Sequence, residues 1–317
     1  MSLKKIELGT TTNITTSYAG EFAGEYIAAA LLSASTINDG GVTVKPNIAF
    51  KEVIKKLDTG ALVSDASCDF NPNSSVTLTE TILQPEEFQV NLQLCKKDFI
   101  SDWEAQSMGY GMSQTLPPKF SDFMIAHVAA EVAQKTEQTM FQGVNANVGE
   151  FDGYEVLLAA DNTVVDVAAV GGGIDAANVI AELGKVVDAI PAALYGKEDL
   201  FIYVPSSAAK FYVQALGGFA AAGLGANGVN NMGTQWWNNG SLTVNGVKLF
   251  VCPGLANDKM IAAQRSNLFF GTGLLNNMNE VKIIDMQDID GSQNVRFVMR
   301  YTAGVQIGIG SDVVFYA

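Results

Sequence analysis

Charged residues are scarce in this chain of 317 residues: only 16% are Asp, Glu, Lys or Arg, against roughly 25% in a typical soluble protein. Basic residues are the scarcer kind, which leaves a formal net charge of −14, and they gather only in pairs such as Lys55-Lys56 and Lys96-Lys97. A protein grips nucleic acid through clustered Lys and Arg. This charge balance therefore argues against a nucleic-acid-binding protein.

The low charge also has a positive meaning, because 48% of the residues are hydrophobic. Obligate subunit interfaces resemble a protein core cut in half and are depleted in charge at their centres. The composition therefore favours a chain that covers much of its surface with other subunits. A large monomer with a big core would fit the same composition.

Long apolar runs are absent too, and cysteines are few. The longest apolar runs, such as YIAAALL at 26–32, are far too short to span a bilayer, and the polar start MSLKKIELG does not resemble a signal peptide. We therefore expect no membrane partner. Three cysteines, odd in number and far apart, favour synthesis in a reducing compartment and show neither a disulfide framework nor a C-x-x-C metal pattern; they are Cys68, Cys95 and Cys252.

Candidate catalytic residues are also few. His127 is the only histidine, so any Ser-His or Cys-His nucleophile would depend on it, yet it lies in a helical pattern without a G-x-S-x-G motif. We interpret it as a packed or interface side chain. Ser207 and Lys210 match the S-x-x-K of serine acylases, but the companion S-D-N and K-T-G motifs are absent. A helix start followed by a solvated lysine is the better interpretation.

An acidic turn comes nearest to a metal site. Asp288 and Asp290 fall in register with a Ca²⁺ loop if Gly291 is its turn glycine, and Asp285 lies close by. The closing position, which needs Glu, is then Phe297, so the pattern fails. We interpret the turn as solvated, and we predict no catalytic, cofactor-binding or metal site and no enzyme.

The stretch GLGANG at 223–228 matches the G-x-G-x-x-G of dinucleotide-binding proteins. That motif needs a strand before it and a helix after it, so that the helix N-terminus meets the pyrophosphate. Here an Ala-rich helical pattern precedes the glycines, and the stretch after them has no helical period. We interpret the segment as an irregular loop without a cofactor. A nucleotide-dependent enzyme using Gly223–Gly228 is the alternative from a different class.

Strand and helix patterns are clearest in the middle of the chain. Residues 76–83 and 88–95 alternate apolar and polar side chains, which predicts a β-hairpin joined by QPEE. One long helix is predicted over about 117–143, opened by two prolines and ended by a glycine. Its apolar residues recur at multiples of four; they are Phe120, Met124, Val128, Val132 and Met140, with Phe123 beside them. About 25 residues make a rod of roughly 38 Å, which is long for a compact domain.

The rest of the chain mixes helices and strands, and YEVLLAADNTVVDVAAV at 154–170 predicts short strands. A helix is predicted from a cap at Asp175, followed by the buried strand DLFIYVP and a second helix capped by Ser206 or Ser207. The pair Asn245-Gly246 predicts a hairpin with a type I′ turn, and the C-terminal part is strand-rich. The predicted fold class is α+β.

This order of elements resembles the major capsid proteins of tailed bacteriophages, which have the Hong Kong 97-like fold. The stretch SVTLTETILQPEEFQVNLQLCKKDFISDWEA is similar to the extended loop that leads into the spine helix, and FMIAHVAAEVAQKTEQTMFQG is similar to the spine helix itself. Later pieces such as DLFIYVPSSAAKFYVQAL and VRFVMRYTAGVQIGIGSDVVFY are similar to pieces of the axial and peripheral domains. The resemblance covers most of the chain from about residue 50 onward.

The resemblance implies a domain organisation. We expect an N-terminal arm at 1–49, an extended β-hairpin loop at 50–95, a peripheral domain with the spine helix at 96–170, an axial domain at 171–284 and the return strands of the peripheral domain at 285–317.

The resemblance also implies a function and partners. Pentamers and hexamers of the chain would close into the icosahedral head of a phage or prophage, enclosing double-stranded DNA without sequence-specific binding. The protein would be made in the bacterial host cytoplasm and end in the virion. Because residue 1 leads almost directly into arm-like sequence, we expect a separate scaffolding protein, and also a portal. A bacterial shell protein of the encapsulin kind shares the fold and is the closer alternative.

Overall fold

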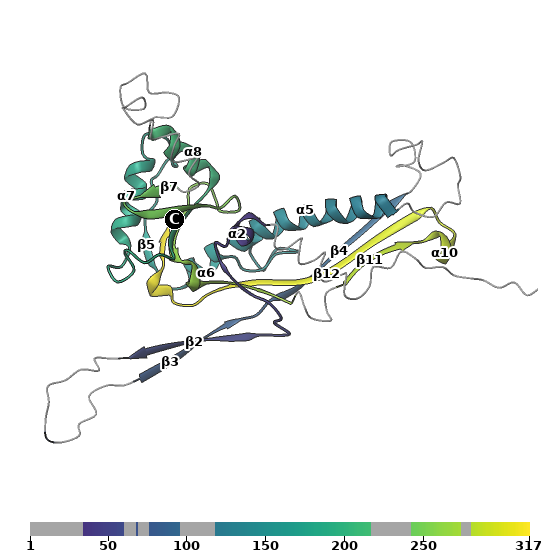
Figure 1. The fold of residues 1–317 in the computed structure, drawn as a ribbon, viewed down its shortest axis with the longest axis horizontal. Helices are drawn as coiled ribbons and strands as arrows, with labels where there is room; N and C mark the ends of the chain where they lie inside the picture. The colour runs from purple at the N-terminus through teal and green to yellow at the C-terminus, as the bar shows by residue number, and fades with distance from the viewer. Residues whose placement is uncertain (1–33, 60–67, 69–75, 96–117, 217–241, 274–279) are drawn as a thin grey trace, which may run out of the picture.

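The computed structural model describes residues 34–59, 68, 76–95, 118–216, 242–273 and 280–317. Figure 1 shows an elongated molecule with a rounded lobe at one end, a long helix running over a sheet, and a two-stranded ribbon projecting from the side. Helices and strands alternate irregularly along the chain. The predicted α+β class is confirmed.

The first sheet runs along the length of the molecule. In it, β1 (Thr43–Lys45) pairs with β10 (Leu268–Thr272), β10 with β12 (Asn294–Ile307), and β12 with β11 (Glu280–Asp285). Strand β4 (Glu86–Cys95) pairs with the same stretch of β12 as β11 does, so β4 and β11 lie on opposite sides of β12. Alternate side chains of β12 are buried on one face of this sheet; they include Val295, Phe297, Met299 and Tyr301.

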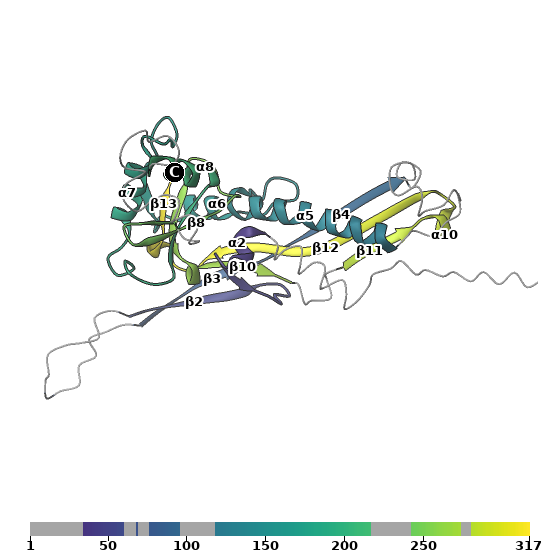
Figure 2. The ribbon, with the colours of Figure 1, turned by 45° about the horizontal axis from the view of Figure 1, so that its top comes forward.

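The predicted long helix is confirmed as α5 (Pro118–Gln142), with Gly143 directly after it. It lies along β4 and β12 in both views (Figures 1 and 2). From the predicted apolar stripe, Val128, Val132 and Met140 are buried, together with Ile125. The side chains of Phe120, Phe123 and Met124 are outside the described residues. The helix therefore uses its apolar stripe to cover the apolar face of the first sheet.

The second sheet forms the rounded lobe. Its six strands follow the order β5 (Val165–Val167), β13 (Val314–Tyr316), β9 (Met260–Gln264), β6 (Leu200–Val204), β8 (Val247–Val251) and β7 (Leu242–Val244). Helices α7 (Val179–Ala189) and α8 (Ser206–Ala215) contact each other and cover this sheet, whereas α6 (Tyr154–Ala160) packs on α5 and β12. Short helical turns complete the fold; they are α2 (Ser35–Asn38), α10 (Gln287–Asp290), η1 (Arg265–Asn267) and η2 (Gly310–Asp312).

Local predictions hold where a short motif determines the backbone. The buried strand over DLFIYVP is confirmed as β6. The turn between β7 and β8 is also confirmed, because Asn245 has φ 49° and Gly246 has φ 83°. Short strands predicted over 154–170 are wrong in part, since 154–160 form helix α6 and only 165–167 form a strand.

Two predicted helix caps are wrong. Helix α8 starts after Pro205, and no side chain caps it. Helix α7 starts after Asn178, while the Asp175 carboxylate accepts the backbone N–H groups of Ala177 and Asn178 in the preceding turn. A polar residue near a helix start can satisfy a turn as well as the helix, and sequence does not separate the two.

The predicted hairpin at 76–95 is also wrong in its pairing. Strand β3 (Val76–Leu83) pairs with β2 (Glu52–Thr59), whereas β4 leaves this ribbon and pairs with β12. The break falls at Gln84-Pro85, where proline removes a backbone donor. Alternation shows which residues share a face of a strand, and it carries no information on which strand is the partner.

Two clusters of buried side chains stabilise the fold, one under α5 and the first sheet and one around the second sheet. They come together near the rings of Phe201, Tyr203 and Phe250, whose centroids lie 5.6 to 6.3 Å apart. Among the described residues, no helix is both long enough and apolar enough to cross a membrane.

Candidate assembly surface

The β2–β3 ribbon carries an apolar face that nothing in the described chain covers. In its register Val53 lies opposite Ile82, and Leu57 lies opposite Leu78. Their side chains are 38%, 46%, 64% and 54% exposed, in that order. Between these two apolar pairs stands a charged pair, Lys55 opposite Glu80, also exposed.

This face differs from the ordinary scatter of exposed apolar residues. Single exposed leucines are common on monomers, whereas here two apolar cross-strand pairs share one face of the ribbon, on either side of a charged pair. An isolated two-stranded hairpin is at best marginally stable in water. The ribbon therefore needs a further surface, and Figures 1 and 2 show it extending below the lobe, well separated from α5.

The root of the ribbon is fixed to the first sheet. Leu83 is fully buried, and it packs so close to Gly271 that a Cβ on this glycine would lie 3.0 Å from Leu83 Cδ2. The side-chain amide of Gln306 donates to the carbonyl oxygen of Ile82 at 2.8 Å. The base of the ribbon is therefore anchored to the first sheet, while its apolar face stays exposed. This arrangement suits a projecting element that contacts another subunit.

A groove of about 760 Å³ lies between α5 and strand β4. Its apolar wall includes Phe88, Val90 and Val132, and Glu131 stands on its helix side. Among the described residues, β4 pairs only with β12, which leaves its other edge unpaired. An edge strand beside an apolar groove is a place where another chain can pair or pack.

Charges at the rim of this groove are ordered by hydrogen bonds. The Lys135 ammonium of α5 contacts the Glu150 carboxylate. Hydrogen bonds from Lys135 and then Asn147 lower the pKa of Glu150 to about 2, so this carboxylate stays ionised. Near the start of β4, burial and then the Asp152 charge raise the pKa of Glu86.

Residues considered for catalysis do not come together. The His127 side chain is exposed on α5 and lines the groove. Ser207 donates to the side-chain oxygen of Asn257 at 3.0 Å, while Lys210 is exposed. Gly223 to Gly228 lie outside the described residues.

In the acidic turn at 285–290, Asp285 and Asp290 use their carboxylates locally, and the side chain of Asp288 is outside the described residues. Asp285 accepts the backbone N–H of Gln287, and Asp290 accepts that of Ser292. Within the described ranges, no three His, Cys, Asp or Glu side chains are grouped as metal ligands would be.

Comparison with known proteins shows which solved structures share this fold. No family model and no curated protein matches this sequence. Solved structures do match: the capsid of a native GTA particle has a TM-score of 0.60 at 10% identity, covering 91% of this chain and 89% of that one. The satellite phage P4 procapsid, with its size determination protein, has a TM-score of 0.54 at 11% identity, covering 92% and 98%.

A virus-like particle from Pyrococcus furiosus is also similar, with a TM-score of 0.50 at 8% identity, covering 94% of this chain and 98% of that one. Such identities establish shared architecture and leave function open. The chain has the fold of tailed-phage major capsid proteins, as the sequence resemblance implied.

Proposed function

We propose that this chain is the major capsid protein of a tailed phage or prophage, and that it assembles into the pentamers and hexamers of an icosahedral head. The observation that supports this proposal most directly is the exposed apolar face of the β2–β3 ribbon on a chain of which 91% is covered by a capsid structure of similar fold. Rings need heterologous contacts that close, in which one patch of a subunit meets a different patch of the next. The ribbon and the α5–β4 groove are such a pair.

Chemistry supports this pairing. The ribbon presents two apolar pairs around Lys55 and Glu80, and the groove offers an apolar wall with Glu131 on its helix side. Docking would bury the leucines and bring the Lys55 ammonium toward Glu131. Removal of an apolar side chain from water contributes roughly 25 cal/mol per Å², so the four exposed ribbon residues provide a substantial driving force.

The acidic character of the chain suits an enclosing wall. A net charge of −14 does not hold phosphate backbones, so packaged double-stranded DNA would be contained without being gripped. We propose a separate scaffolding protein and a portal as further partners, and the virion as the final location. We propose no catalytic, metal or cofactor role.

The five segments expected from the resemblance stand as proposals on the observed fold. The ribbon belongs to the extended loop of 50–95, α5 to the peripheral domain of 96–170, and the second sheet mainly to the axial domain of 171–284. Residues 285–317, proposed as the return strands of the peripheral domain, hold β12 of the first sheet and also β13, which pairs in the second sheet. The arm of 1–49 is described only from residue 34.

A cellular shell of the encapsulin kind is the second candidate. The similarity to the Pyrococcus furiosus virus-like particle favours keeping it, although its TM-score is lower than that of the GTA capsid. The two candidates differ in cargo. Particles purified from the native source would hold double-stranded DNA in the first case and protein cargo in the second.

Charge substitutions on the ribbon test the proposal. The double variant Leu57→Asp, Leu78→Asp alters only exposed side chains, so the subunit should keep its circular dichroism spectrum and lose shells in electron micrographs. The matched control Thr79→Asp adds a charge to the opposite, exposed side of the same strand and should assemble normally. Normal shells from the double variant would contradict the proposed role.

A further inference from the structure

Residues 34–48, defined here as the strap, connect the two halves of the fold. The strap begins beside α5, passes the second sheet, and joins the first sheet as β1. On the second sheet the Tyr203 hydroxyl donates to the carbonyl oxygen of Gly41 at 2.6 Å. Gly41 is held so close to Phe250 that a Cβ there would lie 2.7 Å from the ring. The strap therefore makes specific contacts with both halves.

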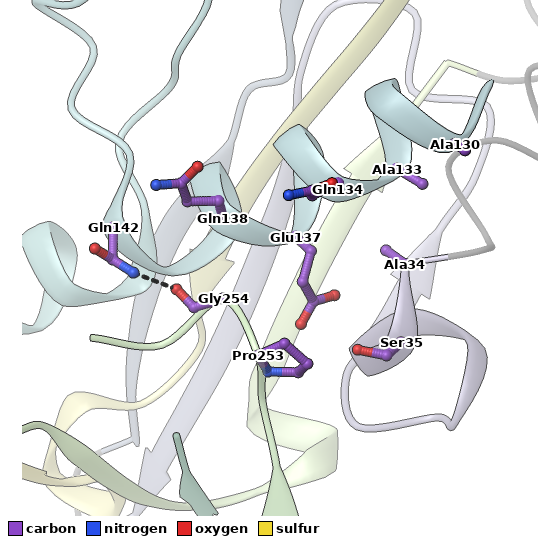
Figure 3. Close-up of a pocket in the computed structure, with 10 residues that line it drawn as sticks. All are labelled: Ala34, Ser35, Ala130, Ala133, Gln134, Glu137, Gln138, Gln142, Pro253 and Gly254. Atoms are coloured by element: carbon purple, nitrogen blue, oxygen red, sulfur yellow. Dashed lines mark hydrogen bonds between the residues drawn. The ribbon is translucent and has the colours of Figure 1, made fainter. Parts of the chain in front are cut away.

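The contact of the strap with α5 centres on one carboxylate. Glu137 accepts the backbone N–H of Thr36 at 3.1 Å, and the Thr36 hydroxyl donates to the other carboxylate oxygen. The side chain of Glu137 points from α5 between the strap and the turn at Pro253-Gly254 (Figure 3). Residues a hundred positions apart in the chain thus meet on a single acidic group.

Glu137 lies in a setting that does not favour a charge. The residue is only 5% exposed, and among the described residues no Lys, Arg or His forms an ion pair with it. Burial raises the pKa of Glu137 above the ordinary value of 4.5, the hydrogen bonds from Thr36 and Gly254 oppose this rise, and the Asp39 charge adds to it. The net effect is that the pKa of Glu137 is raised.

Within the part of the chain that the structure describes, few other titratable groups face Glu137. Asp39 comes from the strap, Cys252 from the turn, and α5 itself contributes the neutral side chains of Gln134 and Gln138 to the same wall. Burial holds the pKa of the Cys252 thiol well above its ordinary value, so Cys252 brings no charge near neutral pH. Protonation of Glu137 is thus the main change that acid brings to this junction.

The junction also borders open space. A cavity of about 740 Å³ lies between α5, the start of the strap and the turn, lined by alanines and glutamines as well as Glu137. If the first turn of the strap moves away, the carboxylate reaches water through this cavity, where its charged form is solvated. The docked strap therefore costs the ionised carboxylate its solvation, and the undocked strap restores it.

We propose that residues 34–41 of the strap are a proton-operated latch, which docks more tightly on α5 and the second sheet when Glu137 is protonated and loosens when Glu137 is ionised. A neutral carboxyl still accepts hydrogen bonds from Thr36, and its own proton can be donated in turn. The proposal concerns the single subunit and is independent of shell assembly.

The direction of the pH dependence follows from the linkage between strap docking and proton binding at Glu137. Burial is the largest cause of the raised pKa of Glu137, and Thr36 of the strap covers both of its carboxylate oxygens, so we assign part of that burial to docking. With that assignment, the docked strap binds a proton more tightly than the released strap does. Docking is therefore strongest below the ordinary value of 4.5 and is progressively lost as pH rises through the docked pKa. Between those two values, one linked proton changes the docking constant by up to about tenfold per pH unit.

Hydrogen exchange measures this directly, because the Thr36 N–H is the donor to Glu137. We would follow peptides covering residues 35–41 of the full-length, unassembled chain by mass spectrometry, and divide out the intrinsic pH dependence of exchange. The protection factor should rise as pH falls through the pKa of docked Glu137 toward 4.5, by up to about tenfold per unit. In Glu137→Gln the protection factor should not change with pH.

Two further variants keep the test sharp. Glu131→Gln removes an exposed carboxylate from the same helix and should keep the wild-type profile. Thr36→Val removes a hydrogen bond that lowers the pKa of Glu137, so its rise in protection should begin at higher pH. The latch is refuted if Glu137→Gln keeps the wild-type profile or if protection grows with rising pH. If Glu137→Gln does not fold, an unshifted profile in Thr36→Val refutes it.

Discussion

Val128→Asp tests how the spine of the molecule is held together. Val128 is 5% exposed on the face of α5 that packs on the first sheet, and it borders the α5–β4 groove. Loss of its apolar burial costs about 1.5 kcal/mol or more. Burial of an unpaired polar group adds roughly 2 kcal/mol at the least. The substitution therefore removes about 3.5 kcal/mol or more of the 5–15 kcal/mol that typically stabilises a domain.

The assay is urea unfolding of the isolated subunit, with insoluble protein as the extreme form of the expected result. His127→Asp is the matched control, because it places the same charge one position away on an exposed site. The control should unfold within about 0.5 kcal/mol of wild type, as exposed substitutions usually do. A Val128→Asp chain that unfolds and assembles like wild type would show that the assigned buried face of α5 is wrong.

Three other outcomes follow from the same account. Replacement of residues 58–75 by a short Gly-Ser linker should leave a subunit with an unchanged circular dichroism spectrum that forms few shells in electron micrographs; normal shells would argue against the loop's role. Gly225→Val should remove no cofactor-linked activity, whereas saturable micromolar NAD or FAD binding that this substitution abolishes would reinstate the dehydrogenase alternative. Gly254→Ala should lower the melting temperature, because its Cβ would lie 2.1 Å from the carbonyl oxygen of Glu137. Gly184→Ala, at a helical position with nothing within 4 Å, should be neutral or stabilising by up to about 1 kcal/mol, and equal melting losses in both would refute the packing argument.

Local sequence signals predicted the parts of the fold that local physics determines. The long helix needed only its apolar repeat, its opening prolines and its closing glycine, and it starts and ends within a residue of the expected limits. The Asn245-Gly246 turn needed only two residues that tolerate positive φ. Both features depend on neighbours in the sequence.

Pairing across long distances was not predictable in the same way. Strands β3 and β4 look alike in sequence, yet one pairs with β2 and the other with β12, about two hundred residues later. Their faces follow from alternation, but their partners follow from how the whole chain packs. A single sequence holds no signal for that choice.

The candidate surfaces show the same limit. Exposed leucines on the ribbon could be recognised only once its true partner strand placed Leu57 opposite Leu78. The burial of Glu137 could not be predicted from the sequence, because a glutamate among polar helix residues is usually solvated. Its burial depends on Thr36 and Gly254, each about a hundred positions away, which the fold brings against the same turn of α5.

If this chain builds a closed shell, the size of its particles will reveal it. The full-length chain would be produced with its scaffolding partner and examined by sedimentation velocity, with electron microscopy of the fastest fraction. We expect uniform, closed particles with pentameric and hexameric units. Their sedimentation coefficient should be far above that of any small oligomer. A chain that stays monomeric at high concentration with that partner present would contradict it.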